Sequence, residues 1–288
     1  MQIGRKPLVY ALLATILIGS AGVWGIGSLL TRATNGRVSI PEKPAHVVQI
    51  DSTDGVRLAG TYWPTADKDA PAILMLHSNG NNRGAMSGTA SWLNTHGYAV
   101  LAIDFRGHGE STPASKSFGL FEAEDAEAAL AWLRQNHPQA RVGVIGFSLG
   151  GAASLLGAKG PLLVDALVLQ GVYPDIRRAI FNRLAIRLGR WPASAIEPLL
   201  SYQSLPRFGV WPSSISPIRA LAQVEAPVLL MGGGKDTNTP PQETRAMYVA
   251  IRANAELRIL EGVTHDALGR TSPETFPILL AFLDRNLK

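Results

Sequence analysis

The sequence predicts an α/β fold in which helices flank a mostly parallel central sheet. Short, almost continuously apolar runs alternate with longer helical patterns, as is typical of parallel strands that are covered on both faces. One helical pattern, Phe121–Gln135, is rich in Ala, Glu and Leu. The predicted strands are Ala72–Leu76, Ala99–Ile103, Val142–Phe147, Leu167–Leu169, Val228–Met231 and Leu257–Leu260.

Two β-rich stretches precede this alternation. They are His46–Ile50 and Val56–Trp63, and the segment Ser52-Thr53-Asp54-Gly55 separates them. A turn of this composition between two such stretches predicts a hairpin at the start of the domain.

The N-terminal residues predict a membrane anchor. No charged residue lies between Leu8 and Leu30, and a helix of that length spans about 34 Å, enough for a hydrocarbon core of about 30 Å. A cleaved signal peptide with a secreted product is one alternative, although its apolar region is usually about 7–15 residues long. A buried core helix is the other. The short basic N-terminus favours a cytoplasmic start, which places the large domain on the periplasmic or extracellular side.

The chain is therefore divided into three parts. Residues 1–31 form the predicted anchor, residues 32–45 a linker with Asn-Gly and two prolines, and residues 46–288 the globular domain. The net charge is +5, but no nucleic-acid motif or Lys/Arg run accompanies it, so we expect no nucleic-acid partner. The absence of cysteine excludes disulfides and a thiolate nucleophile. The sequence does not indicate an oligomeric state.

The most informative segment is Gly146-Phe147-Ser148-Leu149-Gly150, which follows a predicted strand and precedes a small-residue helix start. Glycines at both ends of this G-x-S-x-G pattern leave room for a sharp strand-to-helix turn. The serine side chain then points into a cleft. The pattern therefore predicts Ser148 as a nucleophile.

An acid and a base follow Ser148 in the chain, each after its own predicted strand. Asp236 lies in the glycine-rich segment after Val228–Met231, and His265 follows Leu257–Leu260. The order Ser, Asp, His is the one required when a serine on such a turn is activated by an imidazole. Two alternatives remain open: Asp236 as a helix cap, and His265 as a solvated loop residue.

From about residue 46 onward, the chain resembles the α/β-hydrolase superfamily, and within it the monoacylglycerol-lipase-like and serine-aminopeptidase-like esterases. Residues 146–151 match the nucleophile elbow, and residues 104–111 match the D-x-R-G-x-G-x-S segment after the fourth strand. The G-x-x-D-x-x-x-P pattern runs from Gly233 to Pro240. The resemblance implies a catalytic triad, an acyl-enzyme, and no cofactor or metal. The triad is Ser148, Asp236 and His265.

The resemblance also implies an oxyanion hole formed by two backbone N–H groups. One belongs to Leu149, after the nucleophile. The other belongs to the loop after the third strand, where the family usually has His-Gly and this chain has His77-Ser78-Asn79. Alignment on His77 makes Asn79 the expected donor, although Ser78 replaces the usual glycine.

A cap is predicted at about residues 172–222, because the stretch between two strands there is far longer than an ordinary connection. Within it, Asp175–Arg190 reads as a basic amphipathic helix. We expect this helix to pack over the site, and contact with an anionic membrane surface is the alternative. Its apolar stripe is Ile176, Ile180, Leu184 and Leu188. Trp191, Phe208 and Trp211 are expected in an acyl pocket or in the core of the cap.

Taken as a whole, the sequence predicts a membrane-anchored serine hydrolase that cleaves carboxylic esters. The expected partner is a small-molecule or lipid ester. A serine peptidase or a thioesterase would use the same serine. An α/β-hydrolase-fold protein that binds its ligand without catalysis is the alternative from another class.

Overall fold

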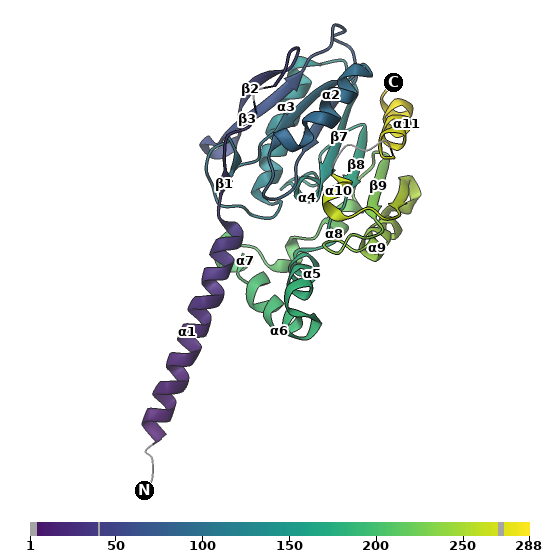
Figure 1. Cartoon of the computed structure of the whole chain (residues 1–288). Coiled ribbons are helices and arrows are strands. Elements are labelled where there is room, and N and C mark those ends of the chain that lie inside the picture. Colours follow the sequence, from purple (N-terminus) through teal and green to yellow (C-terminus); the bar gives the residue numbers. More distant parts are fainter. Residues whose placement is uncertain (1–4, 40, 270–273) are drawn as a thin grey trace.

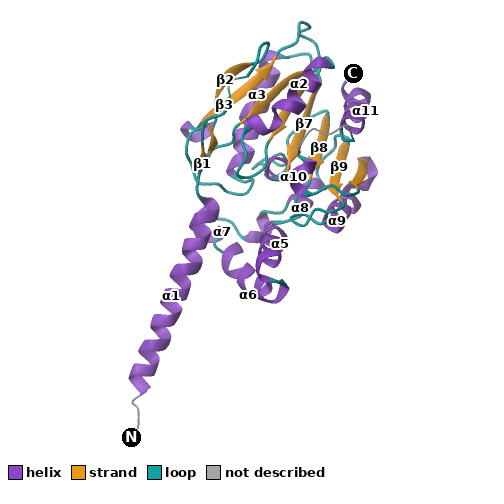
Figure 2. Cartoon of the chain, in the orientation of Figure 1, coloured by secondary structure: helices purple, strands orange, loops and turns teal. Residues whose placement is uncertain are grey.

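The computed structural model describes residues 5–39, 41–269 and 274–288. Its centre is an eight-stranded sheet with the order β10-β9-β8-β7-β4-β5-β3-β2 (Figures 1 and 2). The strands from β10 to β5 are mutually parallel, whereas β3 pairs antiparallel with both β5 and β2. The predicted fold class and hairpin are thereby confirmed. The strands are β2 (His46–Asp51), β3 (Arg57–Trp63), β4 (Ala72–Leu76), β5 (Ala99–Ile103), β7 (Val142–Phe147), β8 (Ala166–Gln170), β9 (Val228–Gly233) and β10 (Ala255–Leu260).

Helices cover both faces of this sheet, and alternate side chains of the buried strands enter two separate cores. In β4, Leu74 and Leu76 belong to one core and Ile73 and Met75 to the other. The first core includes α3 (Phe121–Asn136), α4 (Leu149–Ala153) and α9 (Pro241–Ile251), and the second includes α2 (Ser87–Thr95), α10 (His265–Leu268) and α11 (Phe276–Leu287). Burial on both faces explains why these strands are apolar at every position.

Between β8 and β9 the chain leaves the sheet and forms a group of helices, which occupy the stretch predicted as a cap. The predicted helix over residues 175–190 is observed from Ile176 to Leu188, where Gly189 with φ 81° ends it. Asp175 caps its start by accepting a hydrogen bond from the Arg178 amide at 2.9 Å. The cap helices are α5 (Ile176–Leu188), α6 (Arg190–Ser201), α7 (Ser204–Phe208) and α8 (Pro217–Leu221).

Helix α1 (Arg5–Thr31) extends away from the domain (Figure 1). Its stretch Leu13–Thr31 is long and apolar enough to cross a membrane, and 6% of it is buried, although the helix of an N-terminal signal sequence can also reach this length and hydropathy. Residues 1–4 of the predicted anchor lie outside the described residues.

Part of the predicted linker is bound to the domain. Strand β1 (Thr34–Asn35) pairs in parallel with β6 (His108–Gly109). The Asn35 side-chain amide also donates to the carbonyl oxygens of His108, Gly109 and Ser111, at 3.3, 3.1 and 2.7 Å. The exit of the chain from α1 is therefore fixed by main-chain pairing. Residue 40 of this stretch is not among the described residues.

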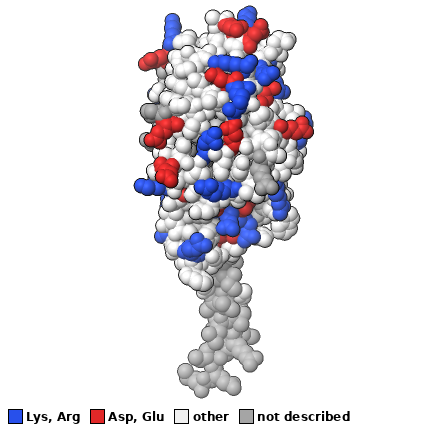
Figure 3. Space-filling model, turned by 90° about the vertical axis from the view of Figure 1, so that its right-hand side faces the viewer, with Lys and Arg blue, Asp and Glu red and all other residues white. Residues whose placement is uncertain are grey.

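Some of the positive charge of the chain is buried in ion pairs that join loops. Arg83, after β4, pairs with Asp104, after β5, and both side chains are almost fully buried. Arg106 makes a similar pair with the buried Asp125 of α3, at 2.8 Å. On the described part of the surface in Figure 3, basic and acidic side chains lie interspersed.

We predict that Arg83→Met lowers the free energy of unfolding by about 3–5 kcal/mol, because it leaves the Asp104 carboxylate buried without its partner. Equilibrium urea unfolding measures this loss. The matched control is Arg57→Met, since Arg57 forms an exposed pair with Asp51, and we expect it to change stability by less than about 1 kcal/mol. Equal effects of the two substitutions would contradict the prediction.

Candidate active site

Ser148 lies in a strained turn between β7 and α4. Its φ and ψ are 51° and −107°, a conformation that residues with a side chain rarely adopt. The Ser148 amide donates to the Gln170 carbonyl at 2.8 Å, and the Ala152 amide donates to the Ser148 carbonyl at 3.0 Å. The strand β8 and the helix α4 thus hold the serine in this conformation.

Close backbone packing explains the glycines around Ser148. A Cβ atom on Gly150 would lie 2.1 Å from the carbonyl oxygen of Leu76 in β4, and one on Gly146 would lie 2.6 Å from the Gly151 backbone. Neither contact is possible for a real side chain. The G-x-S-x-G pattern therefore reflects how tightly the turn packs against the neighbouring strand.

Asp236 and His265 are hydrogen-bonded to each other. Asp236 follows β9, and its Oδ2 accepts a hydrogen bond from His265 Nδ1 at 2.7 Å. Its Oδ1 accepts from the amides of Asn238 and Thr239, both at 2.8 Å. The carboxylate is fully buried. Asp236 therefore accepts hydrogen bonds both from His265 and from amides of its own loop, and those amides precede the next helix, α9, which begins at Pro241.

The imidazole of His265 lies beside the turn that carries Ser148. Its ring centre is 5.1 Å from that of Phe147, and a Cβ on Gly171, which follows β8, would lie 3.2 Å from two of its ring atoms. No hydrogen bond joins Ser148 and His265 within the described residues, and such contacts are often long before substrate binds. The ends of β7, β9 and β10 thus gather the three predicted residues in one region.

The residues of the two expected oxyanion donors line a cavity beside Ser148. Asn79 and Leu149 line it together with Ser148, and neither amide is paired with an acceptor within the described part of the chain. Ser78 does not need the conformational freedom of the glycine that it replaces, because its φ is not positive. The left-handed residue of this loop is Gly80, with φ 79°.

The buried side chain of His77 holds this loop in place through two hydrogen bonds. Its Nδ1 donates to the Ser78 carbonyl at 2.8 Å, and its Nε2 accepts from the Phe105 amide at 3.1 Å. Burial, followed by the charge of His108, lowers the pKa of His77 from 6.5 to about 3. The ring is therefore neutral, and it links the loop after β4 to the loop after β5.

The cavity has a volume of about 500 Å³ and is mostly apolar. The predicted stripe of α5 faces it through Ile176, Ile180 and Leu184. Trp191 and Trp211 instead are 90% and 55% exposed and do not line this cavity. The remaining apolar wall includes Phe118, Tyr173, Leu200 and, from α1, Ile26 and Leu30.

The arginines of α5 have different environments, so the helix is not simply a charged outer face. Arg177 forms two hydrogen bonds with Glu197 of α6, at 3.0 and 2.9 Å. Arg183 and Arg187 line the cavity, and burial lowers the pKa of Arg183.

Within residues 5–39, 41–269 and 274–288, no three His, Asp or Glu side chains are grouped to hold a metal ion.

Known proteins resemble this chain in sequence. Residues 71–202 match the family model of the alpha/beta hydrolase fold. An uncharacterised protein of Mycobacterium tuberculosis (strain H37Rv) is 30% identical over 226 residues, which cover 76% of this chain and 72% of that protein. The chain belongs to the α/β-hydrolase superfamily.

Solved structures of other α/β hydrolases extend the likeness. An esterase of Pyrococcus furiosus has a TM-score of 0.70 and 25% identity, covering 89% of this chain and 99% of its own. A Xanthomonas campestris protein, described as an α/β serine hydrolase without a lid, shares the fold with a TM-score of 0.59 and 18% identity, covering 86% and 98%. The family and these neighbours support hydrolase activity for this chain.

We predict that His77 makes this α/β hydrolase sensitive to acid. Because the pKa of His77 is about 3 in the folded state, well below its ordinary value of 6.5, the unfolded state binds the proton first as the pH falls below about 6.5. The free energy of unfolding therefore declines as the pH falls from about 6.5 to about 3. Urea unfolding at about pH 7.5 and about pH 5 should show a smaller loss in His77→Gln than in the original chain. Identical losses in both would refute this role.

Proposed function

We propose that this α/β hydrolase is a serine hydrolase that cleaves carboxylic esters, with lipid-like or acyl esters as substrates. One observation carries the proposal: Ser148 stands in a strained turn at a mostly apolar cavity, beside a buried His265–Asp236 pair. Strain is retained where surrounding structure enforces it, and such places are often functional sites.

In the proposed mechanism, Ser148 Oγ attacks the ester carbonyl carbon while His265 Nε2 takes the hydroxyl proton. The tetrahedral intermediate then collapses to an acyl-enzyme, and His265 delivers its proton to the leaving alcohol. Water, deprotonated by His265, then attacks the acyl carbon, and the second tetrahedral intermediate releases the carboxylic acid while His265 returns the proton to Ser148 Oγ. Asp236 fixes the His265 tautomer with Nδ1–H and stabilises the imidazolium, because its carboxylate accepts that hydrogen bond.

The negative charge that develops on the carbonyl oxygen requires hydrogen-bond donors. We assign this role to the main-chain N–H groups of Leu149 and Asn79. Leu149 begins α4, so its amide is one of the groups that a helix leaves unpaired. Loss of one such donor costs about 2.7–4 kcal/mol of transition-state stabilisation where it has been measured in another hydrolase.

The lining of the cavity favours an ester with an apolar acyl or alkyl part over a peptide. Side chains from α1, α5 and α6 present carbon to the space beside Ser148, whereas a peptide backbone would need donors and acceptors along its length. A thioester with the same acyl part would also fit. The alternative is a protein that binds such a ligand without catalysis, and in that protein Ser148 would not need to react.

We further propose that α1 anchors the enzyme in a membrane, with the catalytic domain outside the cytoplasm, on the periplasmic or extracellular side. The support is the length and composition of Leu13–Thr31 and the exposure of its apolar side chains, including Leu17 at 68%. Secretion after cleavage of α1 is the alternative.

We predict that a fluorophosphonate probe labels the chain and that Ser148→Ala abolishes this labelling together with p-nitrophenyl ester turnover. His265→Ala should lower kcat/KM at least about a hundredfold, as expected when a general base is lost. Ser87→Ala and His46→Ala, which change exposed residues, are matched controls and should remain close to the original activity. Absent labelling of folded protein would favour the non-catalytic alternative.

We predict that alkaline carbonate leaves the protein in the membrane pellet and that its N-terminal sequence retains α1. A cell-impermeable fluorophosphonate should then label the protein in intact cells. Release into the supernatant with an N-terminus beyond residue 31 would establish cleavage instead. Labelling only after lysis would place the domain in the cytoplasm.

A further inference from the structure

The cavity at Ser148 obtains part of its wall from α1. Ile26 and Leu30, in the last turns of this helix, line the same space as Ser148 and the α5 residues Ile180 and Leu184. Ile26 is 45% exposed and Leu30 is 41% exposed. Each of these two side chains therefore meets both the cavity and the surroundings of the helix.

Side chains of the cap hold α1 in this position. Gln203 Nε2 donates to the Val23 carbonyl at 3.0 Å, and Arg207 Nη2 donates to the Trp24 carbonyl at 2.8 Å and to Ser28 Oγ at 3.0 Å. The Arg207 guanidinium also lies 3.9 Å from the centre of the Trp24 ring. We call Gln203 and Arg207 the clamp.

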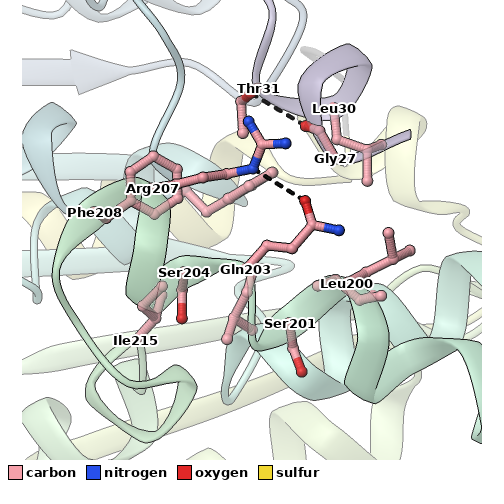
Figure 4. Close-up of a pocket in the computed structure, with 13 residues that line it drawn as sticks. Gly27, Leu30, Thr31, Leu200, Ser201, Gln203, Ser204, Arg207, Phe208 and Ile215 are labelled. Atoms are coloured by element: carbon pink, nitrogen blue, oxygen red, sulfur yellow. Dashed lines mark hydrogen bonds between the residues drawn. The ribbon is translucent and has the colours of Figure 1, made fainter. Parts of the chain in front are cut away.

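Figure 4 shows the clamp side chains lying between the cap and the end of α1. Gln203 Oε1 accepts a hydrogen bond from Arg207 Nε at 3.0 Å, so the two side chains orient each other. The helix lacks a side chain at Gly27, where a Cβ would lie 2.0 Å from Gln203 Oε1. The sequence of α1 thus leaves room for the clamp at the point of contact.

The end of α1 is attached to the domain, and this attachment fixes which residues of the helix lie beside the cavity. Thr31, at the end of the helix, is buried, and its carbonyl accepts a hydrogen bond from the Lys116 amide at 2.8 Å. The clamp binds α1 about two turns earlier. Two attachments on one short segment hold Ile26 and Leu30 between them, so their positions beside the cavity are defined by the domain.

Exposed apolar side chains also lie on and beside the cap helix that contacts α1. On α6, which packs against α1, Leu199 is 55% exposed, and Tyr202, directly after this helix, is 49% exposed. An extended hydrocarbon chain that leaves the cavity past Ile26 and Leu30 would remain in contact with carbon.

We propose that α1 and the cap together form a binding site for the hydrocarbon chain of the substrate, with Ile26 and Leu30 as its outer wall. This site rests on the proposed ester hydrolysis for its biological use, and it assigns α1 a role in substrate binding that a tether does not have. A long acyl chain reaches this wall, whereas a short one bound at Ser148 does not. Chain-length preference is therefore set by the N-terminal helix.

The experiment compares p-nitrophenyl butyrate with p-nitrophenyl dodecanoate, using the full-length chain in one detergent. Ile26→Trp and Leu30→Trp remain apolar but fill the outer part of the cavity. We expect each to lower kcat/KM for the dodecanoate at least about tenfold, as loss of one well-buried aliphatic contact would. Turnover of the butyrate should change less than about twofold.

Leu29→Trp is the matched control, because Leu29 lies on the same turn but does not line the cavity. It should leave both esters within about twofold of the original values. The double variant Gln203→Leu, Arg207→Leu releases the clamp and should reproduce the selective loss on the dodecanoate. An equal loss on both esters in the Ile26 and Leu30 variants, or no loss on either, overturns the proposal.

A binding measurement separates this site from the proposed reaction. In the Ser148→Ala background, a fluorescent dodecyl ether, which cannot be hydrolysed, should bind with a Kd that Leu30→Trp raises at least about tenfold and Leu29→Trp leaves unchanged. If the original chain hydrolyses no ester, the proposed function fails, and this Kd comparison still decides the hydrocarbon site. Equal Kd values in the two Trp variants would overturn it.

Discussion

The close approach of the Ser148 turn to strand β4 is the constraint on which the site depends. With no side chain on Gly150, the start of α4 lies directly against the Leu76 carbonyl. This contact places the Leu149 amide next to the loop that follows β4, where Asn79 lies. The strained serine and the Leu149 amide therefore both lie where the end of β7 packs against the adjacent parallel strand β4.

The loops around this centre are positioned by buried polar groups. Neutral His77 joins the loops after β4 and β5 through main-chain hydrogen bonds, and the Arg83–Asp104 pair joins the same two loops at a second point. Such groups are stable inside a protein only when each is satisfied, so they fix a single arrangement of the loops.

Much of the fold could be predicted from the sequence because its strands are buried on both faces. The runs at Ala72–Leu76, Ala99–Ile103 and Val142–Phe147 coincide with the observed strands, since polar or glycine-rich residues bound them on both sides. The cap was harder to predict. Helix α5 could be predicted from apolar residues spaced by four, whereas α6 contains Pro198 within the helix, a residue that ordinarily argues against a helix interior.

The strained turn at Ser148 could be predicted from one local motif, whereas the contacts between distant segments could not be predicted. The turn at Ser148 can be recognised from the sequence because its close packing requires glycines at fixed positions. By contrast, the apolar run of α1 indicates only length and composition. Nothing local in it shows that Ile26 and Leu30 meet a cavity, because their neighbours Gln203 and Arg207 come from a cap about 180 residues later in the chain.

The pairing of β1 with β6 has a mechanical consequence. A domain that is joined to its membrane segment by a flexible linker can rotate freely, so its active site has no fixed orientation relative to the membrane. Here the segment after α1 is hydrogen-bonded to the domain at once, and no swivel remains at that joint. Where α1 spans a bilayer, the tilt of this helix would set the orientation of the whole domain. A change in bilayer thickness alters helix tilt and would therefore turn the opening of the cavity toward or away from the lipid surface.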